Sequence, residues 1–513
     1  MIASKAGVQF ATPGMYFLAM IPVLVLISGM AWAQVTASIT GAVRDSTGGI
    51  VPAAAVTIKH VESGMTRTAE TDANGNYTVP SLPVGQYEVD AEKTGFKLAV
   101  RKGITLVVAQ QAVVNITLEV GNVEQQVTVT AEAAIVNTTL SPTSGLVGEK
   151  EVKDLPLNGR SFDQLLTLNV GTVNYTANTN GKSGNAFSVV GRRPEENRFL
   201  MNGVDYIGTD NSGQAITPIG ASGQLLGVDA VREFNVVQYS YGAEYGKRAG
   251  AQVTIVTTSG TNRLHGDAFE YLRNSVLDAR NFFDQEIGPF KRNQFGGALG
   301  GPLKKDQLFL FGNYEGFRQR LGITSVAVVP DTQARQGLLP IGPNNSRVQV
   351  PNLKPGMLPF FSFWPAPNGQ ELTGGVALAT GNPLQTVRED FGLLRFDYNA
   401  SAKDSLSANY LMDDGENDTP LANPNFIAIT PIRSQLLGFQ ETHIFSPTIL
   451  RMSRLLGLGA PTRSREDFPR CPFRQTCCLS LEPLPAHSRS EGGPALPARQ
   501  RSLRRAAKSP LSM

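Results

Sequence analysis

The stretch VDAVREFNVVQYSYGAEYGKRAGAQVTIVTTSGTNRLHGDAFEY, from Val228 to Tyr271, decides the fold class of this chain. An acid-capped turn leads into a short apolar strand at Glu233–Val237, and a loop rich in Gly and Tyr follows. The run Ala251–Thr258 is dense in β-branched residues, which favour strands. Residues 259–262 break this run, and alternation resumes between His265 and Tyr271. The stretch therefore predicts a β protein.

The same residues resemble the plug-to-barrel junction of TonB-dependent outer-membrane receptors of the Oar-like branch. In that branch a passage of the form EYG…G…VTIVTKSGTNxxHGxxFEYxRN is typical, and this chain follows it through Arg273-Asn274, with Thr258 in place of Lys. The passages LPLNGRSFDQLLTLNVG (155–171) and FSVVGRRPEENRFLMNGVDY (187–206) also resemble that family. The resemblance implies a plug domain over 136–260 and the first part of a β-barrel over 261–450. Two hairpins of an unrelated β protein are the alternative.

Composition agrees with a β-rich, exported chain. The 52 Gly and 32 Pro residues indicate many turns, and a net charge of +3 implies no basic surface for nucleic acid. Lys5, the apolar run Met15–Met30 and the A-x-A site at Ala31–Ala33 predict a signal peptide over residues 1–33; an uncleaved anchor is the alternative. A second long apolar stretch is missing from the sequence, so any membrane span must be made of strands.

Residues 36–120 predict a β-sandwich. Short alternating runs are separated by closely spaced turn signals, and Asn74-Gly75 within TDANGNY predicts a type I′ hairpin. The passages GAVRDSTGG, PAAAVTI and TDANGNYTVPSLPVGQYEV resemble the carboxypeptidase regulatory-like (Cna-B-type) domain, a non-catalytic module found ahead of the plug in many such receptors. We expect a spacer without a ligand.

The linker at residues 121–135 contains QVTVTAE, and its residues Val127, Thr128, Val129, Thr130 and Ala131 resemble the TonB box. In the family this extended peptide is captured by the inner-membrane TonB protein, which needs a segment whose backbone can add to a sheet edge. The position between sandwich and plug supports this interpretation; an ordinary linker strand is the alternative.

Within the predicted plug, Arg160–Phe162 with Leu165-Leu166 predicts a short helix, and Phe199–Met201 before Asn202-Gly203 predicts a strand entering a tight turn. The resemblance implies that loops and plug apices contact substrate. The candidate substrate-contacting residues are Tyr239, Tyr241 and Tyr245. Packing of these tyrosines between plug and wall is the alternative.

The predicted barrel region reads as antiparallel strands with one long loop. Leu406, Ala408, Tyr410 and Met412 alternate with polar residues, interrupted once by Leu411; in a barrel the apolar face would meet lipid and the polar face the lumen. Residues 301–306 and 400–405 predict short turns, and residues 318–389 predict an extracellular loop.

Residues 451–513 change character. They are rich in Arg, Pro and Ser and lose alternation, which predicts a disordered tail. Out-of-frame translation would produce the same abrupt change in composition and the same loss of alternation. We therefore expect a receptor whose reading frame is lost near Leu450. A natural short receptor with a disordered tail is the alternative.

No pattern of residues predicts an enzyme, a cofactor or a metal site. The four histidines, His60, His265, His443 and His487, are widely separated, and Asp205, Asp210 and Asp229 lie in turn-rich sequence that favours capping roles.

Taken together, the strand patterns and the resemblance predict a mainly β fold: a sandwich, an α/β plug, part of a transmembrane antiparallel barrel and a disordered tail.

The resemblance implies an outer-membrane transporter, in a Gram-negative-type bacterium, for an unknown nutrient of the siderophore, glycan or peptide class. The expected partners are a TonB-type inner-membrane energy transducer, outer-membrane lipid and an extracellular substrate, without nucleic acid. A secreted binding or adhesion protein built on the sandwich is the alternative.

Overall fold

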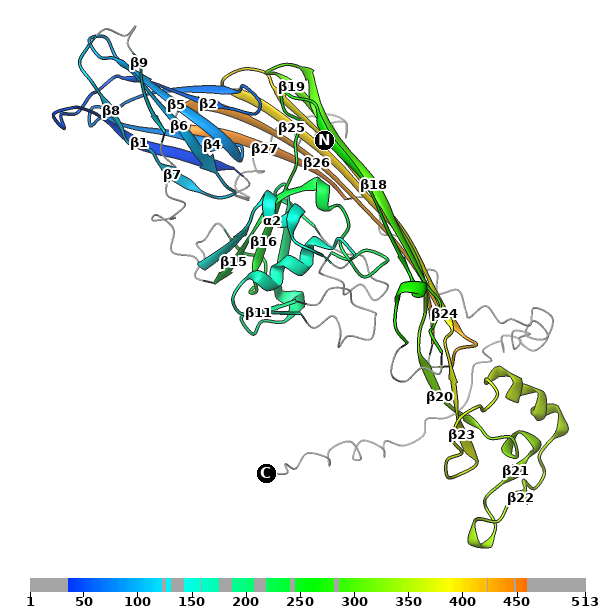
Figure 1. Ribbon diagram of the computed structural model, residues 1–513. Helices are drawn as coiled ribbons and strands as arrows, with labels where there is room; N and C mark the ends of the chain where they lie inside the picture. The colour runs from blue at the N-terminus through cyan, green and yellow to red at the C-terminus, as the bar shows by residue number, and fades with distance from the viewer. Residues whose placement is uncertain are drawn as a thin grey trace, which may run out of the picture. The chain divides into compact units, whose positions relative to one another are not determined.

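The computed structural model contains a β-sandwich, a small α/β domain and a sheet of long strands (Figure 1). It describes residues 36–121, 126–130, 143–157, 159–174, 187–206, 218–239, 245–280, 286–421, 423–446 and 449–458. The predicted signal peptide and the tail beyond residue 458 lie outside the described residues. Among the helices of the described part, none is long and apolar enough to cross a membrane.

The sandwich consists of two sheets whose inward side chains alternate along each strand. One sheet has the order β4-β1-β7, with β8 also paired to β1, and the other has the order β3-β2-β5-β6-β9. Ile39, Val56, Tyr87, Val89 and Ile104 are fully buried between them. The strands are β1 Ala37–Asp45, β2 Ala55–His60, β3 Thr66–Glu70, β4 Asn76–Leu82, β5 Gly85–Glu92, β6 Leu98–Leu106, β7 Gln111–Val113, β8 Ile116–Leu118 and β9 Gln126–Thr130. The predicted β-sandwich is confirmed.

The turn after Asp72 is not the hairpin that Asn74-Gly75 predicts. It joins β3 to β4, which belong to different sheets, so the chain crosses here from one layer of the sandwich to the other. Gly75 has a positive φ of 73°, but Asn74 does not, whereas a type I′ turn needs two such residues. The Asp72 carboxylate accepts hydrogen bonds from the amides of Asn74 and Asn76, both at 2.8 Å, which stabilises the crossing turn instead.

The small α/β domain lies in the region predicted to be a plug, and we call it the plug domain after that prediction; its five-stranded sheet has the order β10-β15-β16-β13-β14. Phe162, Leu165 and Leu166 of η1 are buried, which confirms the predicted short helix. Asn202 and Gly203, with φ of 49° and 79°, form the predicted tight turn. The elements are β10 Thr143–Val147, α2 Glu149–Asp154, η1 Phe162–Leu168, β11 Thr172–Asn174, β12 Phe187–Val189, η3 Pro194–Glu196, β13 Arg198–Met201, β14 Val204–Asp205, η4 Val228–Ala230, β15 Val231–Tyr239 and β16 Gln252–Thr257.

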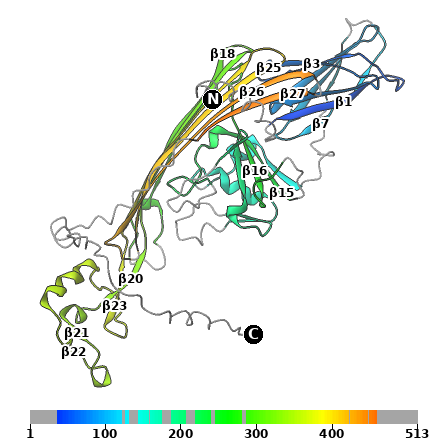
Figure 2. The ribbon, with the colours of Figure 1, turned by 180° about the vertical axis from the view of Figure 1, so that it is seen from behind.

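The third part is a seven-stranded antiparallel sheet, which we call the long sheet, of order β17-β18-β19-β24-β25-β26-β27. Its strands run side by side in both views (Figures 1 and 2). The strands are β17 His265–Asn274, β18 Phe290–Lys304, β19 Leu308–Gly322, β24 Leu384–Asn399, β25 Asp404–Pro420, β26 Ile427–Ser446 and β27 Ile449–Leu458. Within the described residues β17 and β27 are its two edges, so the sheet is an open part of a barrel.

The long connection is shorter and more structured than the sequence predicts. Arg318 and Glu389 pair with other strands, because β19 continues to Gly322 and β24 begins at Leu384. The connection between β19 and β24 contains many Pro, Gly and Asn residues, but these do not prevent local strand pairing. Strand β20 pairs with β23, and β21 pairs with β22. The elements are β20 Ser325–Pro330, η6 Ala334–Gln336, β21 Leu338–Leu339, η7 Pro343–Asn345, β22 Val348–Gln349, η8 Pro355–Phe363 and β23 Val376–Gly381.

Two other boundaries also differ. The predicted turn at residues 301–306 begins later, because β18 continues to Lys304. The last strand extends to Leu458, eight residues past the predicted end of alternation at Leu450. In both places a neighbouring strand supplies backbone partners, and such pairing continues where the side-chain pattern is weak.

The two faces of the long sheet differ in what they meet. Outward positions such as Leu394, Tyr410 and Leu437 are exposed apolar side chains, as expected of a surface that contacts lipid. The opposite face is not simply polar, because Phe311 and Leu411 there join the apolar core of the plug domain. Leu411, the residue that interrupts the predicted alternation, is completely buried in that contact.

Candidate functional site

Arg160 is the centre of the contact between the plug domain and the long sheet. Its Nη2 lies 2.6 Å from the Asp229 carboxylate, and its Nε lies 3.7 Å from that of Glu315 on β19. The guanidinium also stacks on Phe269 of β17, 3.8 Å from the ring centroid. The Glu315 side chain is fully buried, so Arg160 supplies the nearby positive charge that such a carboxylate requires.

The Glu315 carboxylate is also held by hydrogen bonds. The Gly227 amide of the plug domain donates to Oε2 at 2.8 Å, and Gln294 of β18 donates to Oε1 at 2.6 Å. Gln294 Nε2 also donates to the Gly159 carbonyl at 2.9 Å. Gly227 has a φ of 89°, and a side chain there would overlap the ring of Phe391. Backbone of the plug domain therefore approaches the long sheet closely.

A second buried carboxylate repeats this arrangement on the next strand of the sheet. Glu389 of β24 accepts a hydrogen bond from the Ser222 amide at 2.5 Å. On β25, Asn417 donates to the Ala221 carbonyl at 3.1 Å. The segment around residues 220–227 is thus held through its backbone by side chains from three strands.

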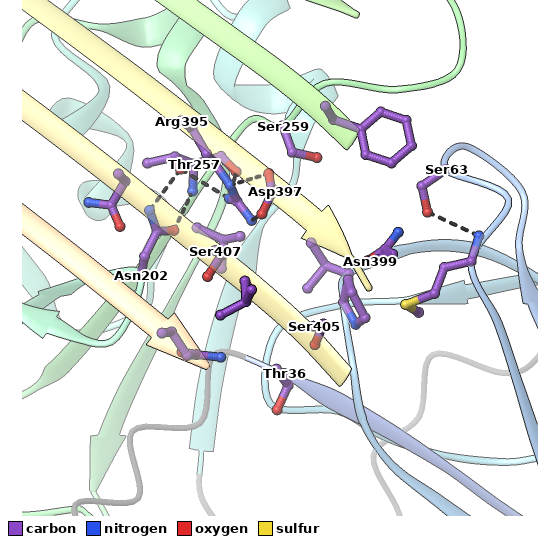
Figure 3. Close-up of a pocket in the computed structure, with 18 of the residues that line it drawn as sticks. Thr36, Ser63, Asn202, Thr257, Ser259, Arg395, Asp397, Asn399, Ser405 and Ser407 are labelled. Atoms are coloured by element: carbon purple, nitrogen blue, oxygen red, sulfur yellow. Dashed lines mark hydrogen bonds and ion pairs between the residues drawn. The ribbon is translucent and has the colours of Figure 1, made fainter. Parts of the chain in front are cut away.

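A third set of contacts joins the end of the plug sheet to the long sheet (Figure 3). Arg395 donates to the Thr257 carbonyl at 2.6 Å and pairs with Asp397 at 2.9 Å. Asn202 and Thr257 exchange two hydrogen bonds, of 2.8 and 3.1 Å. Arg395, Asn202 and Thr257 therefore form one connected set of hydrogen bonds at this end of the site.

A cavity of about 120 Å³ adjoins these residues, lined among others by Ser63, Ser405, Ser407, Asn202 and Thr442. That volume accommodates a few water molecules, whereas pockets for small-molecule ligands usually measure about 300–1,000 Å³. We therefore assign no substrate to this cavity. In the described part of the chain, no group of three or more His, Cys, Asp or Glu side chains is arranged to hold a metal ion.

The TonB-box-like segment lies on the sandwich. Val127, Thr128, Val129 and Thr130 belong to β9, which pairs in parallel with β6 from Leu98↔Gln126 to Lys102↔Thr130. Ala131 lies outside the described residues. The segment is therefore extended, as the predicted role requires, and it occupies the edge of the sandwich sheet.

The three candidate substrate-contacting tyrosines lie at or after the end of β15. The backbone of Tyr239 pairs with Thr143, and Tyr245 is half-buried. Tyr241 lies outside the described residues. Their contact with substrate stays a prediction.

The sandwich contacts the plug domain through charged groups at the start of β15. Arg232 donates to the Glu62 carboxylate at 2.8 Å, and Glu233 accepts a hydrogen bond from the Val108 amide at 2.5 Å. Burial raises the pKa of Glu62, but the hydrogen bond and charge of Arg232 outweigh it and the net pKa is lowered. Burial also lowers the pKa of His60 beside this pair to about 4, so His60 is neutral near pH 7.

Glu233 makes the contact between sandwich and plug domain sensitive to pH. Burial raises its pKa to about 7, although the Val108 amide and Arg232 act against this and Glu149 adds to it. The docked state therefore keeps a proton that the free carboxyl group loses, and its stabilisation is lost as pH rises through 7. Docking should weaken by about 1 kcal/mol between pH 6 and pH 8.

Hydrogen exchange of the Val108 amide, corrected for intrinsic rates at the two pH values, measures this change. Glu233→Gln keeps an acceptor oxygen without the titration, so its protection should be the same at both pH values. His60 and Glu62 do not titrate in this window, given their lowered pKa values. Equal pH dependence in the wild type and Glu233→Gln would contradict the assignment to Glu233.

The expectation of capping roles for the turn aspartates is wrong for two of them. Asp229 pairs with Arg160, and Asp205 pairs with Arg198 at 2.7 Å. Asp210 lies outside the described residues. Sequence reasoning also missed Glu315 and Glu389 as site residues. The sequence did contain one signal for Glu315. In a strand, Glu315 lies on the same face as Phe311 and Phe317, both of which are buried, so its carboxylate was also to be expected in a buried position.

Comparison with known proteins agrees with this architecture. Residues 38–119 match the family described as carboxypeptidase regulatory-like domain, and residues 256–462 match the outer membrane beta barrel domain. The TonB-dependent transporter Oar of Myxococcus xanthus is 28% identical over 309 residues. That match covers 56% of this chain and 27% of Oar, so the chain spans about a quarter of the relative's length.

The solved structures that match this chain are more distant in sequence. The outer membrane transporter YddB from Escherichia coli is 12% identical with a TM-score of 0.38, covering 59% of this chain and 37% of that one. The siderophore receptor PirA from Acinetobacter baumannii is 15% identical with a TM-score of 0.34, covering 61% and 44%. The family matches and the Oar match identify this outer-membrane chain as a homologue of the TonB-dependent transporter Oar, with a carboxypeptidase regulatory-like domain ahead of an outer membrane β-barrel domain.

Proposed function

We propose that this chain works as the N-terminal part of a TonB-dependent outer-membrane transporter. The observation that carries the proposal is the plug domain held against the inward face of the long sheet by Arg160, Glu315 and Glu389. A domain seated there would close the barrel until it is rearranged. Energy would come from a TonB-type partner in the inner membrane, which pulls on the segment Val127–Ala131.

The substrate is an extracellular nutrient that we propose to be taken up without chemical change. Among the candidate contacts, Tyr239 and Tyr245 end or follow β15, the strand of the plug domain that also carries Arg232 and Glu233. A ligand at these tyrosines would therefore act on the same strand that contacts the sandwich. We propose a substrate of the siderophore, glycan or peptide class.

The role of the TonB-contacting segment predicts a specific sensitivity to proline. Adding a strand to a partner's sheet relies on backbone N–H groups, and Val129→Pro removes one in the middle of the segment. We expect binding of the purified periplasmic domain of TonB to fall at least about tenfold, a loss of roughly 1.4 kcal/mol. Surface plasmon resonance with the full chain in detergent measures it.

Val123→Pro is the matched control, because it places the same residue in the linker but outside the segment. It should leave TonB binding within about twofold of the wild type. Equal binding by Val129→Pro and the wild type would show that this segment is not the TonB contact.

A further inference from the structure

The TonB-contacting segment is engaged within the chain itself. In the described residues β9 pairs with β6 over five consecutive positions and forms the end of the sheet β3-β2-β5-β6-β9. Without β9, strand β6 would present an open row of backbone donors and acceptors, which natural sheets tend to cover. The segment proposed for TonB thus covers the edge of the regulatory-like domain.

We propose that the regulatory-like domain is a latch that holds the TonB-contacting segment until TonB displaces it. The inference rests on the proposed function of Val127–Ala131. The row of backbone groups on β9 that bonds to β6 cannot at the same time bond to a strand of TonB. Binding through that row therefore requires β9 to leave β6.

The pairing has the properties of a latch that can open. It is parallel, and parallel pairs are slightly less stable per residue than antiparallel ones. It is short, and it holds an edge strand at the end of a sheet rather than one between two neighbours. TonB would meet the segment only in the fraction of molecules in which it is released, so the apparent affinity falls by that fraction.

The regulatory-like domain is fixed to the plug domain by contacts that do not involve β9. Arg232 pairs with Glu62, Glu233 bonds to Val108, and the Asn262 amide donates to the Glu62 carbonyl at 2.9 Å. Val84 and Val108 also share a small apolar cluster with Val256 of β16. Release of β9 would therefore leave the sandwich docked on the plug domain and ready to recapture the segment.

A disulfide between the paired positions Lys102 and Thr130 would lock the latch. Lys102 has an exposed side chain, so Lys102→Cys should not disturb the core. Both substitutions are made in the full chain, with Cys471, Cys477 and Cys478 changed to Ser. The control pairs Thr130→Cys with Lys59→Cys, because Lys59 is on β2 and two strands further from β9. That separation, about 9–10 Å more, is beyond the reach of a disulfide.

We expect the Lys102→Cys/Thr130→Cys protein to crosslink on mild oxidation, as read by intact mass and gel mobility, and the control to remain reduced. Binding of the purified TonB periplasmic domain should then fall at least about tenfold in the locked protein and return with reductant. The oxidised control should bind like the wild type. A synthetic peptide of residues 122–135, which has no latch, should bind more tightly than the full chain.

Other results overturn the proposal in distinguishable ways. Failure of the paired cysteines to crosslink means that β9 is not held on β6. Unchanged TonB binding by the locked protein means that TonB uses the outer edge of β9 or another segment. If the peptide binds TonB in either case, the proposed function survives and only the latch is wrong. If neither peptide nor reduced protein binds, the TonB assignment itself fails, and the latch with it.

Discussion

Replacing Arg160 with Met should weaken the hold of the plug domain on the long sheet by about 3 kcal/mol. Removing one partner of a buried ion pair leaves the other charge without compensation, which typically costs about 3–5 kcal/mol. The side chains of Asp229 and Glu315 are only 9% and 0% exposed, so water cannot take the place of Arg160. Met retains an apolar contact with Phe269, which restricts the change mainly to the charge.

The measurement is the urea concentration at which the plug domain becomes open to protease in outer-membrane preparations. A loss of 3 kcal/mol raises the open population about a hundredfold at a given urea concentration. Arg192→Met is the matched control, because the Arg192–Glu196 pair is 4.0 Å apart and its side chains are 58% and 39% exposed. Exposed pairs contribute little, so the control should change by less than about 0.5 kcal/mol.

A double variant tests the cause of the effect. Adding Glu315→Gln to Arg160→Met removes the uncompensated charge and keeps an oxygen that can accept the hydrogen bond of Gly227. Part of the lost stability should return. If the double variant is as open as the single one, loss of charge compensation is not the reason for the opening.

Gly41→Val should destabilise the sandwich by about 2–6 kcal/mol. A Cβ at Gly41, in the middle of β1, would overlap the carbonyl oxygen of Val114, which is backbone and cannot rotate away. Overpacking of this kind costs about 1–3 kcal/mol. The same oxygen accepts a hydrogen bond from the buried Tyr77 hydroxyl at 2.7 Å, and a hydroxyl left without a partner costs a further 1–3 kcal/mol or so.

Hydrogen-exchange protection of β1 and β4 in the full chain is the measurement, because both strands surround the altered position. Gly48→Ala is the control: its φ of 88° strains any side chain, but nothing lies within 4 Å of the added carbon. It should cost about 1 kcal/mol. Wild-type protection of β1 in Gly41→Val would mean that the loop at Val114 moves aside without loss.

The order of the parts and most of their strands follow from the sequence alone. Alternation of side chains predicts β17 and β25, and runs of apolar or β-branched residues predict β15 and β16. Both are local properties that survive in any context. The Asn202-Gly203 turn was also predictable, because it needs only the conformational freedom of those two residues. Other strands were not predicted, among them β3, β6, β18, β19 and the strands β20–β23 of the predicted loop. Arg101, Lys102 and Gly103 interrupt the alternation in β6, and β3 shows only a short polar alternation.

Tertiary structure decided what those elements contact. The sequence around Asn74-Gly75 is compatible with a hairpin, and only the assignment of β3 and β4 to different sheets excludes one. Leu411 is an apolar residue at a position where the alternation predicts a polar one, and the reason is that the plug domain buries it. Arg160 and Glu315 are far apart in the chain, and burial makes their charges interact strongly only once the plug domain is seated. The pairing of β9 with β6 likewise depends on which sheet edge is open, a property of the assembled sandwich that no local pattern of residues contains.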